Sequence, residues 1–453
     1  MFLFLVVYLL LGTSCTVKPY FLSHKHRSPL RKLALKEETF NEQQIFCKHV
    51  ASLGLKSNIQ ILHSAKSRIK AYCISDLHAD SKNNFQWTLE NCVRKADDSD
   101  VFTILIVPGD LGSETEILDK IFSALVQQYD AVCYVPGNHE VWRRGTATGG
   151  SVLSVESADE RRARNDREAV NSLMKYKEVM LLAEKRAIHT TPLYVSSQGR
   201  GVWVVPFQSW FHSNWDTEPD LTHPDYLKAQ KVIPFTKMWS DFWMCSWPAD
   251  LLSHDEFVSI DGNNDVLARF FDSINDGYMS DINITHHDTV LSFSHFVPRE
   301  ELCPEKRFLL EPLLSRVIGS VYLEKRIRLL KPHLHMFGHT HIPIDLTIDG
   351  VRYLQWPLGT HKESKRQCAL IHNSGPLLVY DSALGVGVGD GIPVNLASEH
   401  VHWTQYYRHY ERTPNVTDVI APWVQKRLDR FRGLIESATK TATANESNPS
   451  LHE

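Results

Sequence analysis

Short apolar runs alternate with segments of helical periodicity in the first third of the chain. Ile69–Ser75, Phe102–Val107 and Ala131–Val135 are rich in apolar and β-branched residues, and the helix-like stretches Phe85–Ala96 and Ile117–Leu125 separate them. Because Phe102–Val107 is apolar throughout, it is typical of a strand buried on both faces. This alternation predicts a parallel sheet with crossover helices, in which functional sites form at the carboxyl ends of the strands.

The remaining patterns predict further helices and a second sheet. Ser113-Glu-Thr-Glu116 has the spacing of a capping box at the start of a helix, and Asp349-Gly350 is typical of a type I′ turn between two strands. Helical periodicity favours helices at 312–330 and 421–437. Two partly parallel sheets packed between helices would accommodate these elements. Further strands are predicted at 193–195, 202–205, 289–294, 334–337, 343–348, 351–356, 368–372 and 377–380.

The composition indicates a globular chain with an aromatic-rich insertion. A hydrophobic fraction of 43% suffices for a sizeable core, and the net charge of −4 gives no overall attraction to nucleic acid. Within 208–247, five tryptophans crowd together with prolines, which predicts a loop-and-helix insertion. It could form a lid or substrate wall, although packing against the body is the expected role for most of these rings. The tryptophans are Trp210, Trp215, Trp239, Trp243 and Trp247.

The N-terminus has the features of a targeting presequence. Phe2–Leu11 is continuously apolar but short for a membrane span, and residues 18–36 are basic without an acidic residue. This pattern resembles a bipartite plastid presequence used through the secretory route, and simple secretion or a membrane-anchored N-terminus are the alternatives. No transmembrane segment is expected in the mature chain. The eight scattered cysteines lack CxxC spacing, so reduced thiols are expected.

We therefore expect the following organisation. Residues 1–36 form a presequence and 37–68 an approach segment. Residues 69–381 form the main α/β domain, with the insertion at about 208–285. A C-terminal extension with a helix covers 382–437, and 438–453 form a disordered tail.

Metal-binding side chains follow five of the apolar runs. They occur in Ile74–Asp80, Pro108-Gly-Asp110, Pro136–Glu140, Ser294-His295 and Gly338–His341, each at the end of a predicted strand. Oxygen and imidazole ligands without thiolates suit two divalent cations that share a carboxylate and keep coordination positions open. The candidate ligands are Asp76, His78, Asp110, Asn138, His295, His339 and His341.

The order of these motifs resembles the calcineurin-like metallophosphoesterases over roughly 69–380. The resemblance implies a four-layer α/β/β/α sandwich of two mixed sheets and a metal-dependent phosphoesterase. It also implies two divalent or trivalent ions (Mn, Fe or Zn) and a phosphorylated small molecule or phosphoprotein as substrate.

The resemblance also assigns roles to individual residues. Asp76, His78 and His341 would hold the first metal, whereas Asn138, His295 and His339 would hold the second. Asp110 would bridge the two ions. A metal-bridging hydroxide would attack phosphorus in line, and His139 would bind the phosphate and act as general acid, with Asp76 or Glu140 as its partner. Asn138 would also contact the substrate. Independently of the resemblance, Arg143 and Arg144 lie one helical turn further on, where they could bind a phosphate bidentately, although at least one of them is expected to be a solvated surface arginine.

Two departures narrow the family assignment. Leu111 follows Asp110, where purple acid phosphatases have a tyrosine, and the Asp-Arg-Gly of PPP-type phosphatases is missing as well. The segments Gln355–Gly359 and Pro206–Trp210 resemble a branch of the family found in plants, protists and bacteria, from which no substrate follows.

Phosphomonoesters are the preferred substrate class. The alternatives are a phosphodiesterase or nuclease on the same site, for which Arg161-Arg162, Arg143-Arg144 and Lys365-Arg366 give only thin basic clusters, or a non-catalytic scaffold of the same fold. A scaffold would be expected to lack a ligand or His139.

Overall fold

The structure is a computed structural model that describes residues 40–93, 99–143, 171–230, 235–259, 265–384, 391–430 and 432. The chain forms two compact units, Met1–Gln43 and Gln44–Glu453. In the first unit the structure describes only the beginning of helix α1 (Phe40–Leu53), and both sheets belong to the second unit. Several predicted features lie outside the described residues: the presequence, Arg144, the cluster Arg161-Arg162, part of the C-terminal extension (385–390) and the predicted tail.

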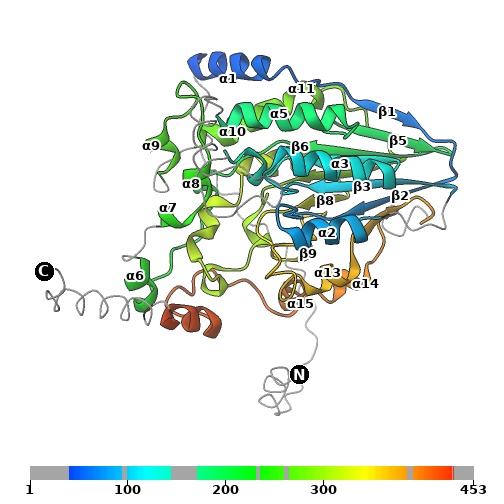
Figure 1. Cartoon of the computed structure of the whole chain (residues 1–453). Coiled ribbons are helices and arrows are strands. Elements are labelled where there is room, and N and C mark those ends of the chain that lie inside the picture. The colour runs from blue at the N-terminus through cyan, green and yellow to red at the C-terminus, as the bar shows by residue number, and fades with distance from the viewer. Residues whose placement is uncertain are drawn as a thin grey trace, which may run out of the picture. The chain divides into compact units, whose positions relative to one another are not determined.

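The smaller sheet has four strands in the order β11-β2-β3-β4. The parallel strands β2 (Arg68–Cys73), β3 (Val101–Pro108) and β4 (Ala131–Val135) are the three runs that open the domain, and β11 (Leu377–Asp381) pairs antiparallel with β2. Helices α2 (Lys82–Asn91) and α3 (Thr115–Gln128) connect the parallel strands (Figure 1). The predicted β-α-β-α-β series is therefore confirmed.

The larger sheet has seven strands in the order β1-β5-β6-β7-β8-β10-β9. At its centre β6, β7, β8 and β10 run parallel, while β5 and β9 are antiparallel to their neighbours β6 and β10. The β9–β10 hairpin turns at Asp349 and Gly350, both with positive φ, as a type I′ turn requires. The strands are β1 (Gln60–His63), β5 (Leu193–Ser197), β6 (Arg200–Phe207), β7 (Asp288–Ser294), β8 (Leu334–Phe337), β9 (Ile344–Ile348) and β10 (Val351–Gln355).

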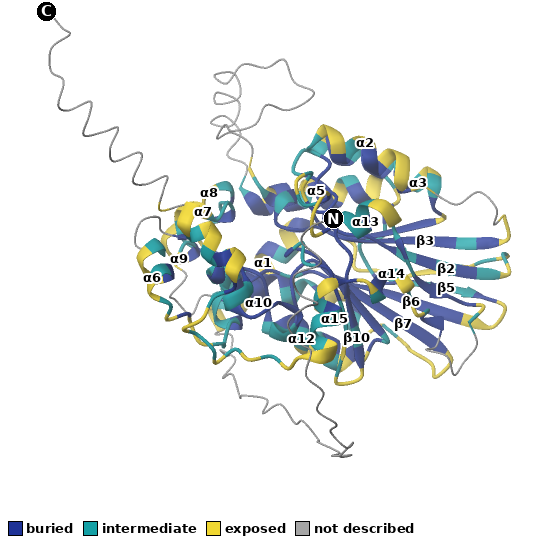
Figure 2. Cartoon of the chain, turned by 90° about the horizontal axis from the view of Figure 1, so that it is seen from below, coloured by how far each residue is buried: buried dark blue, intermediate teal, exposed yellow. Residues whose placement is uncertain are grey.

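The two sheets share a hydrophobic core and are covered by helices. Ile104 and Ile106 of the smaller sheet and Leu291 and Phe293 of the larger sheet belong to one buried cluster. Strands β3, β4 and β7 are buried on both faces. Figure 2 shows β3 and β7 largely in dark blue, and α2 and α3 with exposed sides in yellow. This arrangement confirms the predicted layered α/β fold with two mixed sheets.

The aromatic-rich insertion lies between β6 and β7 and contains several short helices. Trp210, Trp215 and Trp247 are buried in a second apolar cluster, which confirms the packing role for most of the tryptophans, whereas Trp243 is 44% exposed. The helices are η2 (Ser213–Trp215), α6 (Pro224–Gln230), α7 (Phe235–Met238), α8 (Asp241–Met244), α9 (His254–Phe257), α10 (Val266–Ile274) and α11 (Asp276–Met279).

The other helices connect and cover the strands. The predicted C-terminal helix is present at 422–430. Further helices in the described part of the chain are η1 (His139–Val141), α5 (Ser172–Lys185), η3 (Glu300–Leu302), η4 (Lys306–Phe308), η5 (Pro312–Val317), α12 (Val321–Leu330), α13 (Ala369–Ser374), α14 (Leu396–Glu399) and α15 (His402–His409).

Two local predictions are wrong. Residues 368–372 do not form a strand. Cys368 is the N-cap of helix α13, and Cys368 and Ile371, three positions apart, are fully buried, which is helical spacing. The capping box at Ser113 is also absent. Instead, the carboxylate of Asp80 accepts hydrogen bonds from the backbone N–H groups of Ser113 and Glu114 and from the Ser113 hydroxyl, so a residue from another loop caps α3.

Three further features of the described residues can be compared with the sequence predictions. The segment expected as an approach to the domain contributes α1 and the edge strand β1, which pairs with β5. The cysteines at positions 47, 73, 92, 133, 245, 303 and 368 are all free. Among the described residues, no helix has the length and apolar character needed to cross a bilayer.

Candidate metal centre

The loops at the strand ends hold their polar side chains in an unusual backbone conformation. Non-glycine residues adopt positive φ only rarely, and such strain concentrates at functional sites. In this chain the positive φ angles, between 43° and 77°, include those of five candidate ligands: Asp76, His78, Asp110, His339 and His341. Asp76, His78 and Asp110 follow β2 and β3 of the smaller sheet, and His339 and His341 follow β8 of the larger sheet. The two sheets share one core, so the loops of both sheets contribute to the same cluster.

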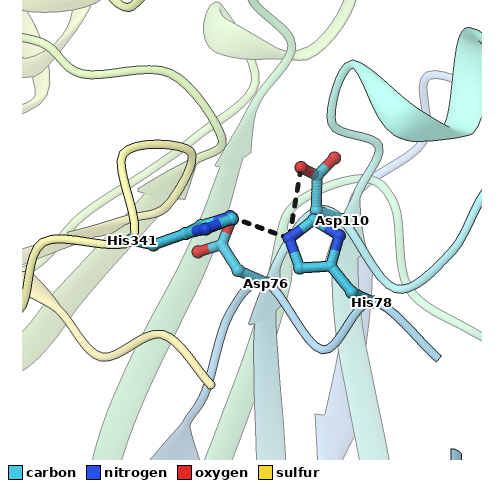
Figure 3. Close-up of side chains that lie close together, drawn as sticks. All are labelled: Asp76, His78, Asp110 and His341. Carbon is cyan, nitrogen blue, oxygen red and sulfur yellow. Dashed lines mark hydrogen bonds and ion pairs between the residues drawn. The ribbon is translucent and has the colours of Figure 1, made fainter. Parts of the chain in front are cut away.

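A first group contains Asp76, His78, Asp110 and His341. One donor atom from each residue lies within 4.8 Å of the others. The Nε2 atoms of His78 and His341 are 2.7 Å apart, and Nε2 of His341 lies 3.5 Å from Oδ1 of Asp76. Figure 3 shows these four side chains pointing toward one another.

A second group contains Asp110, His295 and His339, whose donor atoms also lie within 4.8 Å. Asn138 completes this group, because its Oδ1 lies 3.0 Å from Nε2 of His295 and 3.0 Å from Nδ1 of His339. The structure thus gathers all seven predicted ligands in two groups that share Asp110.

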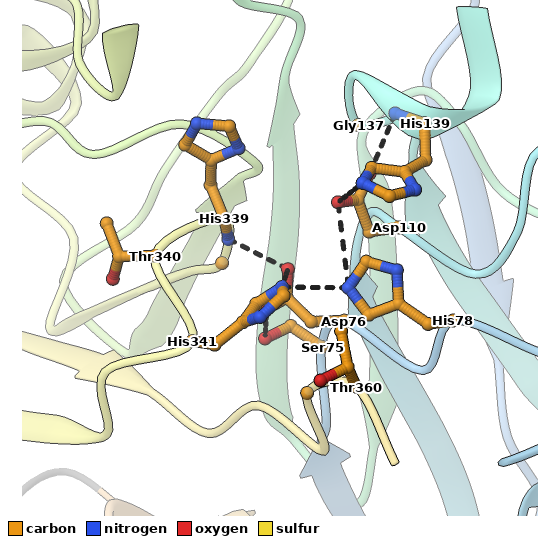
Figure 4. A network of polar contacts seen from close by, with 12 residues as sticks. Ser75, Asp76, His78, Asp110, Gly137, His139, His339, Thr340, His341 and Thr360 are labelled. Atoms are coloured by element: carbon orange, nitrogen blue, oxygen red, sulfur yellow. Dashed lines mark hydrogen bonds and ion pairs between the residues drawn. The ribbon is translucent and has the colours of Figure 1, made fainter. Parts of the chain in front are cut away.

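The orientation of Asp110 suits a bridging carboxylate. Its Oδ2 faces the first group, 3.9 Å from Nε2 of His78, and its Oδ1 faces the second group, 3.6 Å from Nε2 of His295. The backbone N–H of His139 donates to Oδ1 at 3.1 Å and fixes this rotamer (Figure 4). Each oxygen is therefore directed toward a different group.

Hydrogen bonds on the outer side of three imidazoles fix the direction of their lone pairs. His295 donates from Nδ1 to the carbonyl of Pro108 at 3.0 Å, and His339 donates from Nε2 to the carbonyl of Val317 at 3.0 Å. His341 donates from Nδ1 to the carboxylate of Glu363 at 2.8 Å. Because the acceptors hold these protons, the other nitrogen of each ring presents a lone pair to the centre, as in metal sites.

Two glycines allow the loops to approach one another. A Cβ at Gly137 would lie 2.2 Å from Oδ1 of Asp110 and 2.7 Å from the ring of His295. A Cβ at Gly338 would lie 2.7 Å from the carbonyl of Pro108. A larger residue at either position would force the two groups apart.

Four buried carboxylates give the centre a strong demand for positive charge. Burial raises the pKa of Asp76 to about 6, and burial together with Glu140, Asp76 and Asp241 raises that of Asp110 well above its ordinary value. At His341, burial lowers the pKa, but the hydrogen bond to Glu363 and the charge of Asp76 outweigh burial and raise it. Bound cations would stabilise the ionised forms of these neighbouring carboxylates. The oxygen and imidazole donors suit Mn, Fe or Zn ions.

His139 lies beside both groups without joining either. Its Nε2 is 3.8 Å from Oδ2 of Asp110, and its ring stacks on Trp142 at a centroid distance of 3.6 Å. Burial, with the neighbouring histidines, lowers the pKa of its imidazole well below the ordinary value. A side-chain exposure of 23% leaves it accessible to a substrate.

The two carboxylates expected as partners of His139 are engaged elsewhere. Asp76 accepts hydrogen bonds from the backbone N–H of His339 at 2.9 Å and from the hydroxyl of Ser75. Glu140 is fully buried and accepts from four backbone N–H groups. These belong to Gly137 at 2.8 Å, Leu111 at 2.7 Å, Asp110 at 3.2 Å and Gly112 at 3.4 Å. Glu140 therefore holds the two metal-ligand loops together.

The predicted basic residues lie on the surface. Arg143 is exposed, and its backbone N–H donates to the carbonyl of Met244 in the insertion at 2.9 Å. Lys365 and Arg366 are exposed as well.

Three polar residues around the ligands were not predicted from the sequence. The carboxylate of Asp241 accepts hydrogen bonds from the Asn138 amide, and Glu363 holds His341. Gln355 donates to the carbonyl of Gly338 at 2.7 Å and bonds Thr340, so it fixes the loop that presents His339 and His341. None of the three lies in a motif of ligand spacing, and only their contacts reveal them.

Comparison with known proteins decides the family. The family model for calcineurin-like phosphoesterases matches residues 69–343, more than half of the chain. The chain belongs to this family. Calcineurin-like phosphoesterases are metal-dependent, and the chain is accordingly a metal-dependent phosphoesterase that acts on phosphorylated substrates.

Solved structures with partial similarity include three hydrolases. Phosphopantetheinyl hydrolase from Mycobacterium tuberculosis is 18% identical, with 67% of this chain and 93% of that chain covered and a TM-score of 0.44. A putative 5'-nucleotidase from Staphylococcus aureus is 13% identical, with coverage of 64% and 48% and a TM-score of 0.27. A cold-active protein-tyrosine phosphatase from a Shewanella species is 12% identical, with coverage of 66% and 73% and a TM-score of 0.28. A comparison with curated proteins found no match.

Proposed function

We propose that this calcineurin-like phosphoesterase hydrolyses phosphate monoesters at a dinuclear metal centre. The observation that carries the proposal is the convergence of imidazole lone pairs and the Asn138 amide oxygen on both sides of Asp110. Asp76, His78 and His341 would hold one ion, Asn138, His295 and His339 the other, and Asp110 both. Two such ions supply Lewis acidity that activates water and stabilises charge on the phosphoryl group.

The chain's own residues have separate tasks in this proposal. The neutral amide at Asn138 keeps the total negative charge of the ligands low. His139, 3.8 Å from Asp110 and partly exposed, hydrogen-bonds the phosphate and delivers a proton to the leaving oxygen. Trp142 holds the imidazole of His139 in place by stacking. Arg143, on the surface beside this loop, binds an outer phosphate oxygen.

The test compares a phosphomonoester with a phosphodiester. Para-nitrophenyl phosphate and bis-para-nitrophenyl phosphate are offered to protein loaded with Mn²⁺, Zn²⁺ or Fe²⁺, and the proposal expects faster turnover of the monoester. Preferred turnover of the diester would move the function to the alternative class, phosphodiesterase or nuclease. No turnover of either ester with any of the metals would contradict the catalytic proposal.

A variant series separates the proton donor from the ligands. His139→Ala should lower kcat about 100- to 10,000-fold, the usual contribution of general acid catalysis, without loss of bound metal. His372→Ala is the matched control, because His372 is a histidine remote from the ligands that packs on Trp87 of the α2 helix. Unchanged kcat in His139→Ala would remove the proposed role of this residue.

A further inference from the structure

Asp241 is a buried carboxylate that the insertion places against the second group of candidate ligands. Its exposed fraction is 0%, and it lies at the first position of α8, 103 residues from Asn138 in sequence. An ionised carboxylate accepts hydrogen bonds but cannot donate one, so the polar groups around it must be donors. This requirement determines how its neighbours are oriented.

Three side-chain donors meet at this carboxylate. Asn138 donates from Nδ2 to Oδ1 at 2.9 Å, Trp142 donates from Nε1 to Oδ1 at 2.6 Å, and Trp239 donates from Nε1 to Oδ2 at 2.8 Å. The only polar atom of each indole is its N–H, which can donate but not accept, so neither indole can exchange its role in these hydrogen bonds. Only the amide of Asn138 has a choice of orientation.

The choice matters because the two ends of an amide differ in chemistry. With Nδ2 held by Asp241, Oδ1 of Asn138 points to His295 and His339, at 3.0 Å from a ring nitrogen of each. The flipped amide would present an NH₂ group there, which has no lone pair for a cation. The acceptor-only character of Asp241 therefore selects the orientation that can bind metal.

The Asp241 carboxylate also connects the insertion to two aromatic side chains that contact His139 and His339. Trp142 stacks on His139, and Trp239 lies edge-on to His339 at a centroid distance of 5.8 Å. Both indoles are hydrogen-bonded to Asp241, and through Asn138 it also contacts the second group of ligands. These contacts place the insertion next to the ligand centre.

We infer that Asp241 is a positioning residue, which fixes the Asn138 amide with its oxygen toward the second metal. The inference rests on the proposed function, because it assumes that Asn138 is a ligand. Losing a partner of this kind typically weakens metal binding about 10- to 100-fold. The effect should fall on the second ion, since Asp241 bonds none of Asp76, His78 and His341 in the described residues.

Mn²⁺ titration of the full chain tests the inference. In Asp241→Asn the volume is kept, but the amide at this position can donate as well as accept, and the orientation of Asn138 is no longer imposed. Wild-type protein should bind two Mn²⁺ ions, and the variant should bind one of them about 10- to 100-fold less tightly while the affinity for the other is unchanged. Asp265→Asn is the matched control, because Asp265 is also buried in the insertion but bonds Arg269 and Tyr322.

A reciprocal exchange distinguishes positioning from support of the fold. Asn138→Asp alone sets two carboxylates against each other and should also weaken the second ion. Combining Asn138→Asp with Asp241→Asn restores one donor and one acceptor, so binding of the second ion should recover relative to both single variants. If Asp241 only supported the fold, the exchanged pair would not recover binding of the second ion.

Each outcome decides between the inference and the function on which it rests. Wild-type protein that binds no Mn²⁺ pair would overturn the proposed function itself. Two ions in wild type, with unchanged affinities in Asp241→Asn or without recovery in the exchanged pair, would overturn only the role of Asp241. If Asp241→Asn does not fold, the comparison of Asn138→Asp with the exchanged pair decides whether Asp241 positions the amide.

Discussion

The substitution Glu140→Gln should destabilise the metal-free protein by about 2–3 kcal/mol. Oε1 of Glu140 accepts the N–H groups of Leu111 and Gly112, and Oε2 accepts those of Gly137 and Asp110. A glutamine has one oxygen, so one pair of buried N–H groups would face an NH₂ group instead. An unsatisfied buried donor costs about 1–3 kcal/mol, and each pair contains one short and one longer bond. The loss of repulsion between Glu140 and Asp110 offsets part of this cost.

Urea denaturation in EDTA, followed by tryptophan fluorescence, measures this change. The control is Glu178→Gln, since the side chain of Glu178 is 48% exposed, and exposed substitutions change stability by less than about 0.5 kcal/mol. If Glu140→Gln is as stable as that control, Glu140 does not hold the two loops together, and the interpretation of its four hydrogen bonds is refuted.

Three further predictions concern the surroundings of the site. Glu363→Gln should weaken the first metal about 10- to 100-fold in a competition titration, because it weakens the partner of His341; equal affinities would contradict this role. Burial lowers the pKa of His335 to about 3, so the unfolded state takes up a proton first and stability should fall, by up to about 1.4 kcal/mol per pH unit, as the pH drops below about 6.5. Urea midpoints of His335→Gln should show a shallower pH dependence than wild type, and an equal slope would exclude His335 as a source. Finally, Asp110→Asn should abolish the rise in Tm on adding Mn²⁺ but leave the metal-free protein at least as stable, since it removes a charge repelled by Glu140 and Asp76; a retained Mn²⁺ effect would show that the carboxylate is not required.

The β-α-β-α-β series and the ligand loops could be predicted because they depend on strong local patterns. Ala131–Val135 is a continuous apolar run, and the structure gives β4 the same bounds. Loops that follow the parallel strands of one sheet meet at the same edge of that sheet. Asp76 and His341 follow strands of different sheets, and the packing of the two sheets around a shared core brings them into one cluster.

Other elements lacked a local signal. Cys368–His372 is too short for its periodicity to separate strand from helix, and only burial of Cys368 and Ile371 shows the helical spacing. Strand β1 is mostly exposed, so it has no apolar alternation.

The polar residues behind the ligands could not be predicted from spacing. Asp241 lies in an aromatic-rich insertion, and its relation to Asn138 is purely tertiary. The same holds for Asp80, whose carboxylate replaces the predicted cap of α3 from a different loop. Such contacts depend on which loops the fold brings together.

Anomalous diffraction from crystals grown with Mn²⁺ tests the central claim most directly. Two peaks about 3.5–4 Å apart are expected on either side of the Asp110 carboxylate, one beside His78 and His341 and the other beside Asn138 and His295. A single peak, or peaks remote from Asp110, would contradict the dinuclear centre on which the proposed chemistry depends.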